Sequence, residues 1–196
     1  LNDMNKSTNS WTIGGILNWT RQYFSDKGVE NPRLDAEVLL SRILGLDRLH
    51  LYVHFDQPLE QTELRAFREF VKQRAMRFPV AYITGSKEFM GLEFAVSPAV
   101  LIPRPDTEIL VEGAIDLLHN IAEPQLLDIG TGSGAIIISA LTKLPDAQGT
   151  AVDISAEALA VALRPLEVVE QAPDVVAAYV DALRHGRGHL RQVRLQ

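Results

Sequence analysis

Apolar residues recur at helical spacing through the first part of the chain. Residues 49–55 could form either a short helix or an extended piece, but three segments show the helical pattern clearly, residues 13–25, 33–44 and 62–78. Thr62 is a suitable N-cap for the third of these helices. The pattern therefore predicts a small helical bundle over residues 1–78, whose first dozen residues are polar and frayed.

The pattern changes to that of short strands after residue 78. Aromatic and β-branched residues punctuated by glycine, at residues 80–85 and 88–96, are typical of a β-hairpin. The prolines of Pro103-Arg104-Pro105 then favour an extended turn. We expect residues 79–108 to form a β-hairpin linker between two larger parts of the chain.

Strands and helices alternate in the last part of the chain. Asp106 or Thr107 should cap a helix that ends at Leu118. The pattern after it predicts two strand–helix pairs, at residues 125–129, 135–144, 149–154 and 156–163. This order is the signature of a doubly wound parallel sheet. We therefore expect an α/β, Rossmann-like domain over residues 109–196.

Composition and charge limit the classes of function. Of the 196 residues 46% are hydrophobic, and the net charge of −6 argues against a broad nucleic-acid face and against direct nucleic-acid partners. The sequence has no cysteine, which excludes disulfides and zinc–thiolate sites. No apolar run approaches the roughly 18 residues of a membrane span, and the first residues have no apolar signal core. We expect a cytoplasmic protein without a membrane partner.

The stretch LLDIGTGSGA, residues 126–135, predicts a ligand-binding turn between a strand and a helix. Its glycines let a ligand approach the backbone, and the helix that follows offers free N–H groups. The permissive dinucleotide pattern is satisfied, but Asp128 before the turn would repel a pyrophosphate and suits a cationic group, such as the ammonium of S-adenosylmethionine. The residues predicted to bind the cofactor here are Asp128, Gly130, Thr131, Gly132, Ser133 and Gly134.

A second acid is expected to complete this site. Asp153 ends the next predicted strand and lies 19 residues after Gly134. An acid in this place accepts hydrogen bonds from the hydroxyls of a ribose in both S-adenosylmethionine and nicotinamide enzymes, so Asp153 favours an adenosine ligand without choosing between them. The alternative is that Asp153 only caps the helix that follows Ser155.

The quoted motifs resemble a known family. LLDIGTGSGA followed by AVDIS is similar to the first two cofactor motifs of class I methyltransferases, and EFMGLEF and LIPRPDTE resemble the HemK/PrmC family of peptide chain release factor glutamine methyltransferases. The resemblance covers roughly residues 12–163. It implies a helical substrate-docking domain before a class I methyltransferase domain. It also implies methyl transfer from S-adenosyl-L-methionine to the side-chain amide of the glutamine in the GGQ motif of release factors.

The sequence departs from the family in its last part. The family orients the glutamine amide with an Asn-Pro-Pro-Tyr motif that this sequence does not contain, since Asn31-Pro32 is followed by Arg33. The catalytic residues are therefore unassigned, and we expect little methyl transfer by the chain as written. The sequence stops matching the family after Leu163, which a truncated, frameshifted, incompletely recorded or diverged chain would each produce, and so we expect an incomplete methyltransferase domain.

Other residues have two interpretations each. Phe89 could pack in the core or lie beside the transferred methyl, and Arg104 could bind a cofactor carboxylate or brace Glu108. A helix is possible at residues 175–183, and the glycines around His185 and His189 argue against a metal site, so we expect no metal. One helix carries basic residues that could be a solvated face or a docking surface for an acidic release factor: Arg65, Arg68, Lys72, Arg74 and Arg77.

Three other functions stay open at this point. Adenine amino-methyltransferases of nucleic acids use the same chemistry, although the acidic composition disfavours them. The missing Asn-Pro-Pro-Tyr motif would suit a catalytically incomplete remnant that binds a cofactor or a partner. A nicotinamide oxidoreductase is disfavoured by Asp128 and Gly134.

Overall fold

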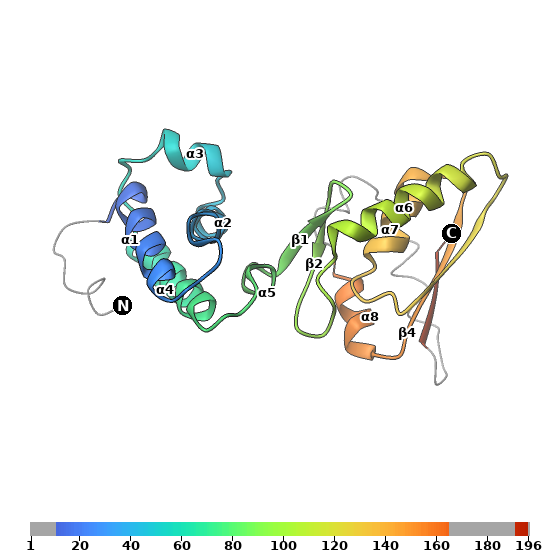
Figure 1. Cartoon of the computed structure of the whole chain (residues 1–196). Coiled ribbons are helices and arrows are strands. Elements are labelled where there is room, and N and C mark those ends of the chain that lie inside the picture. The colour runs from blue at the N-terminus through green and yellow to red at the C-terminus, as the bar shows by residue number, and fades with distance from the viewer. Residues whose placement is uncertain (1–10, 165–190, 196) are drawn as a thin grey trace. The chain divides into compact units, whose positions relative to one another are not determined.

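A computed structural model describes residues 11–164 and 191–195 (Figure 1). The chain divides into two compact units, with the boundary between Thr84 and Gly85. The helix predicted at residues 175–183 and the two histidines, His185 and His189, lie outside the described residues.

The first unit is a bundle of helices around one apolar core. Its helices are α1 (Ile13–Asp26), α2 (Pro32–Leu44), α3 (Arg48–Val53), α4 (Gln61–Ala75) and α5 (Val80–Thr84). Helix α1 begins after Thr12, whose Oγ1 accepts a hydrogen bond from the backbone N–H of Gly15 (3.1 Å). Phe24 and Phe67 are fully buried in the core. This arrangement confirms the predicted helical first part.

Two local predictions for this unit are wrong. Helix α4 is capped by Glu60, whose backbone N–H donates to Glu63 Oε2 (2.7 Å) in a capping box, so Thr62 lies inside the first turn. Residues 80–84 form helix α5 and not a strand. The reason is that the carbonyl of Pro79 accepts hydrogen bonds from the backbone N–H groups of Tyr82 (3.1 Å) and Ile83 (3.2 Å), which starts a helical turn.

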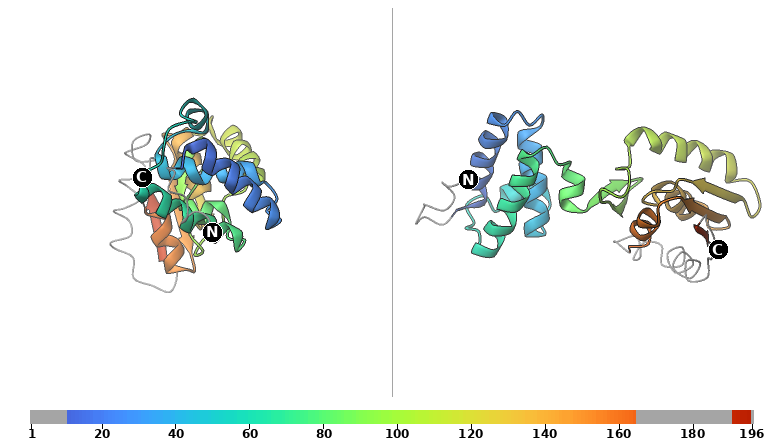
Figure 2. Two further views of the ribbon diagram at one scale, coloured as in Figure 1. Left: turned by 90° about the vertical axis from the view of Figure 1, so that its left-hand side faces the viewer. Right: turned by 90° about the horizontal axis from the view of Figure 1, so that it is seen from below.

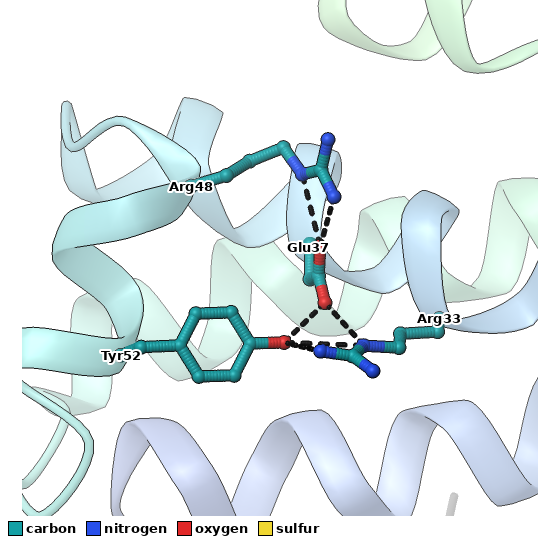
Figure 3. A network of polar contacts seen from close by, with 4 residues as sticks. All are labelled: Arg33, Glu37, Arg48 and Tyr52. Carbon is teal, nitrogen blue, oxygen red and sulfur yellow. Dashed lines mark hydrogen bonds and ion pairs between the residues drawn. The ribbon is translucent and has the colours of Figure 1, made fainter.

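A buried carboxylate ties helix α2 to helix α3 (Figure 3). The side chain of Glu37 is only 2% exposed. Its Oε1 accepts hydrogen bonds from Arg33 Nε (2.8 Å) and from the Tyr52 hydroxyl, and its Oε2 accepts two from Arg48, from Nε (2.9 Å) and Nη2 (2.6 Å). Charges are rarely buried unless they are paired in this way.

The second unit opens with a hairpin and a long helix. Strands β1 (Ser86–Phe89) and β2 (Leu92–Ala95) pair antiparallel through a two-residue turn, in which Met90 and Gly91 both have positive φ. Helix α6 (Pro105–Leu118) follows. Its N-cap is Arg104, so the prediction of a cap at Asp106 or Thr107 is wrong. Pro105 is favoured as the first helical residue because its φ suits a helix and it has no N–H to leave unpaired.

The rest of the unit contains a mixed sheet and the helices that connect its strands. Strands β3 (Gln125–Ile129) and β4 (Gln148–Asp153) are parallel and are joined by helix α7 (Ala135–Lys143), which confirms the predicted α/β pattern. Helix α8 (Ala156–Ala162) follows β4. Strand β5 (Arg191–Leu195) pairs antiparallel with β4, in a stretch where the sequence pattern predicts no strand, and the strand order is β3-β4-β5.

Helices α6, α7 and α8 and the hairpin share one apolar core with β4, and the helices can be followed beside the sheet in Figure 2. Helix α7 packs closely on the sheet at Gly149, where a Cβ would lie 2.7 Å from Leu141 Cδ1, so the Leu141 side chain would have to shift to admit it. On β3 the side chains alternate, and Leu127 and Ile129 stay exposed. This packing brings the end of β3, the turn after it and the end of β4 together.

Candidate cofactor site

The turn between β3 and α7 has a backbone that only glycine adopts easily. Gly130, Gly132 and Gly134 have φ values of 79°, 57° and 80°. The backbone N–H groups of Gly130 and Thr131 both donate to the carbonyl of Val152 on β4 (2.8 and 3.1 Å). A Cβ built at Gly130 or Gly132 would meet no atom within 4 Å. The turn therefore borders open space into which a ligand can approach the backbone.

Two carboxylates hold this turn from either side. Asp128 Oδ2 accepts a hydrogen bond from the hydroxyl of Thr131 (2.7 Å). Asp153 Oδ2 accepts one from the backbone N–H of Gly132 (2.9 Å). Four of the residues predicted to bind the cofactor therefore lie together and are joined by hydrogen bonds: Asp128, Thr131, Gly132 and Asp153. The sequence predicted their neighbourhood but contained no signal for these particular bonds.

Asp153 does not cap the helix that follows it. The cap of α8 is Ser155, whose Oγ accepts a hydrogen bond from the backbone N–H of Ala158 (3.1 Å). Asp153 Oδ1 instead accepts from the backbone N–H of Ser155 (2.9 Å). The two oxygens of Asp153 therefore bridge the glycine turn and the start of the next turn. A carboxylate has about four lone-pair positions, so both oxygens can still accept from ribose hydroxyls.

The carboxylate of Asp128 lies in a partly buried environment. Burial raises the pKa of Asp128 above its ordinary value. Hydrogen bonds from the Thr131 hydroxyl and from the backbone N–H of Ile137 oppose this rise, and the nearby charge of Asp153 adds to it. Ile137 lies in the first turn of α7, so Asp128 lies beside the free N–H donors at the start of that helix. A cation beside this carboxylate would offset its cost of burial.

The remaining predicted residues differ in their surroundings. Ser133 is buried and continues the turn towards α7. Phe89 is 1% exposed and packs edge to face against Phe94 in the core, which favours the packing interpretation. Arg104 is exposed at the N-cap of α6. Glu108 accepts a hydrogen bond from the backbone N–H of Met90 (2.8 Å) and so fastens α6 to the hairpin turn.

Of the five basic residues expected on one helix, Arg77 lies beyond the end of α4, and two of the five are used inside the first unit. Arg74 Nε donates to Asp35 Oδ2 (2.6 Å), and both side chains are largely buried. Arg77 Nη2 donates to the carbonyl of Lys27 (3.0 Å). Arg74 and Arg77 therefore stabilise the bundle, whether or not the remaining basic residues, Arg65, Arg68 and Lys72, contact a partner.

Within residues 11–164 and 191–195, no three His, Asp or Glu side chains are grouped so that they could hold a metal ion. None of the described helices is both long enough and apolar enough to cross a membrane.

Comparison with known proteins defines the class of this chain. Residues 15–85 match the model of the PrmC N-terminal domain, and residues 106–188 match the model of the methyltransferase small domain. A helical PrmC domain followed by a methyltransferase domain is the order that the two units show. The two matches together cover most of the described residues.

Curated relatives identify the family within this class. The release factor glutamine methyltransferase of Geobacter sulfurreducens is 50% identical over 164 residues, which are 84% of this chain and 57% of the relative. Proteins of the same name from Rhodopirellula baltica and Chlorobaculum tepidum are 47% and 44% identical, over 78% and 79% of this chain and 53% and 54% of the relatives. The chain belongs to the HemK/PrmC family, and it spans about half the length of these relatives.

Proposed function

We propose that the glycine turn binds S-adenosyl-L-methionine. The observation that carries this proposal is that carboxylates already occupy donors that a pyrophosphate would need. The N–H of Gly132 donates to Asp153, and Asp128 engages the N–H of Ile137 at the start of α7. A dinucleotide would have to displace these acids and meet two negative charges, whereas a cation gains from both. The residues present therefore fit a cationic adenosine cofactor.

Each group of the site has a separate role in this proposal. Asp153 accepts hydrogen bonds from the ribose hydroxyls with the lone pairs that the backbone leaves free. Asp128 binds the ammonium of the amino-acid part. Gly130 and Gly132 leave the backbone open to the ligand because no Cβ stands in the way. S-adenosylmethionine supplies a methyl group carried on a positively charged sulfur.

We further propose that the methyl acceptor is the glutamine side chain in the GGQ motif of peptide chain release factors. Support comes from the names of the relatives and from the PrmC N-terminal domain. An amide nitrogen is a weak nucleophile, so the enzyme must orient it and accept its hydrogens. No Asn-Pro-Pro-Tyr sequence occurs among residues 1–196, so the residues that do this are unassigned. The cytoplasmic location stays a prediction from composition.

Ligand titration tests the cofactor. Calorimetry should show binding of S-adenosylmethionine and of its product S-adenosylhomocysteine, and weaker or no binding of NAD. Gly132→Val should abolish binding, because a β-branched residue is strained at a φ of 57° and its side chain fills the open space. Gly113→Val is the matched control, since a Cβ at Gly113 of α6 meets nothing within 4 Å. Tighter binding of NAD would overturn the assignment.

Methyl transfer tests the acceptor. The chain is incubated with methyl-labelled S-adenosylmethionine and either a release factor that carries Gly-Gly-Gln or the same factor with Gly-Gly-Ala. We expect a small amount of label, on the glutamine alone, because no assigned group accepts the amide hydrogens. Label on nucleic acid added in place of the release factor would favour the amino-methyltransferase alternative.

A further inference from the structure

Thr131 is held more rigidly than a residue of an open turn needs to be. Its side chain is buried, with the residue 7% exposed. Its backbone N–H donates to the carbonyl of Val152 (3.1 Å), and its own carbonyl accepts from the N–H of Gly134 (2.9 Å). Its hydroxyl donates to Asp128 Oδ2 (2.7 Å). The backbone bonds of the turn therefore fix the direction of the Thr131 hydroxyl. The hydroxyl then fixes the orientation of the Asp128 carboxylate.

The groups that face Asp128 come from each neighbouring element. The turn contributes the Thr131 hydroxyl, α7 contributes the N–H of Ile137, and β4 contributes the negative charge of Asp153. The first two favour the ionised carboxylate, and burial and Asp153 disfavour it. Removal of the hydroxyl would take away the side-chain donor that fixes the orientation of this buried carboxylate.

We propose that Thr131 is a positioning residue, whose hydroxyl orients the carboxylate of Asp128 towards the ammonium group of the amino-acid part of the cofactor. This inference rests on the proposed function of the site. Thr131 acts through Asp128, and its buried side chain need not touch the ligand. Loss of the hydroxyl should weaken ligands that carry the ammonium and leave unchanged those that consist of the adenosine part alone.

Two ligands distinguish the contribution of the amino-acid part of the cofactor from that of the adenosine part. S-adenosylhomocysteine carries the ammonium, and 5′-methylthioadenosine has the same adenosine and sulfur but no amino-acid part. Thr131→Val should weaken S-adenosylhomocysteine by about 2- to 10-fold, as expected for the loss of one hydrogen bond, with the affinity for methylthioadenosine unchanged. Thr131→Ser keeps the hydroxyl and should keep both affinities. Thr142→Val is the matched control, because the Thr142 hydroxyl donates to the carbonyl of Ile138 within α7.

A pH profile adds a readout that a purely structural role would not move. Binding of S-adenosylhomocysteine should weaken as the pH falls through the pKa of Asp128 in the free protein. Without the hydroxyl this pKa is higher, so in Thr131→Val the weakening should begin at a higher pH than in the wild type or in Thr131→Ser. Methylthioadenosine should show no such difference between the variants.

The outcomes distinguish the inference from the proposed function. If the wild type binds neither ligand, the proposed cofactor site is wrong. If the wild type binds both and Thr131→Val weakens both equally or neither, the positioning role is wrong and the cofactor site stands. If Thr131→Val does not fold, Thr131→Ser still decides the matter, since a loss of S-adenosylhomocysteine affinity in that variant contradicts a role for the hydroxyl alone.

Discussion

The buried carboxylate of Glu37 allows a stability prediction that is independent of the cofactor. We consider Glu37→Gln, which keeps the shape of the side chain and removes its charge. Glu37 is 2% exposed, whereas the side chains of its partners Arg33 and Arg48 are 68% and 54% exposed. The arginines can therefore be hydrated after the change. The new amide places an N–H group against donors, because Arg33, Arg48 and Tyr52 all donate to Glu37.

The expected loss of stability is the cost of removing the charge of Glu37, less the hydration that the two arginines regain. Removal of one partner from a fully buried ion pair costs about 3–5 kcal/mol. One hydrogen bond to a charged group contributes about 1.5–3 kcal/mol. Because water can replace Glu37 at both arginines, we expect Glu37→Gln to lower the free energy of unfolding of the first unit by about 2 kcal/mol. Glu69→Gln is the control, since Glu69 pairs with Lys72 at the surface and should cost less than about 0.5 kcal/mol.

Urea denaturation followed by tryptophan fluorescence measures this difference. Both tryptophans, Trp11 and Trp19, belong to the first unit, so the signal reports that unit alone.

Burial alone would raise the pKa of Glu37, but hydrogen bonds from Tyr52, Arg33 and Arg48 outweigh burial and lower it. A lowered pKa means that the stabilisation is present above the ordinary pKa of glutamate and is lost as the pH falls through the folded-state value. The difference between wild type and Glu37→Gln should therefore shrink on acidification. Equal midpoints for Glu37→Gln and Glu69→Gln at neutral pH would refute this reasoning.

Three further changes test the second unit. Gly149→Ala should destabilise it by about 1–3 kcal/mol in thermal melts, because its Cβ would crowd the side chains of Leu141 and Ile137, whereas Gly113→Ala should not destabilise it. Asp153→Ala should weaken both S-adenosylhomocysteine and methylthioadenosine by roughly 1–3 kcal/mol in calorimetry, and unchanged affinities would leave Asp153 with the role of a brace only. Glu108→Ala should speed amide exchange at Met90 relative to wild type, because it removes the acceptor of that N–H group, and an unchanged rate would mean that the hairpin holds its turn without α6.

Predictions from the sequence succeeded where the signal is local. The apolar spacing of residues 13–25 anticipates α1 to within one residue at its end, and the strand of residues 125–129 coincides with β3. Glycines after a strand and an acid at the end of each strand are also local patterns. They were enough to predict which residues of the site lie together.

The predictions failed where the outcome depends on a neighbour. Residues 80–84 have the composition of a strand, but the carbonyl of Pro79 starts a helix there. Strand β5 is defined by its pairing with β4, which no pattern within residues 191–195 reveals. The buried network of Glu37 needs donors from α2 and α3, and a glutamate in a helix is usually read as exposed.

Asp128 and Asp153 show that one acid can hold the turn and also keep lone pairs free to bind a ligand, so the two roles are not alternatives. For Asp153 the sequence offered a choice between a helix cap and a ribose ligand, as if one excluded the other. In the structure each oxygen of Asp153 accepts one backbone N–H, which uses about half of the lone-pair positions of the carboxylate. Asp128 likewise receives the Thr131 hydroxyl and the N–H of Ile137. These hydrogen bonds hold each carboxylate in one orientation before a ligand arrives, so less ordering is left for binding to accomplish. An acid that braces the turn is therefore better prepared to bind the cofactor, and substitutions at Asp128 and Asp153 should affect the stability of the turn and the affinity for ligand together.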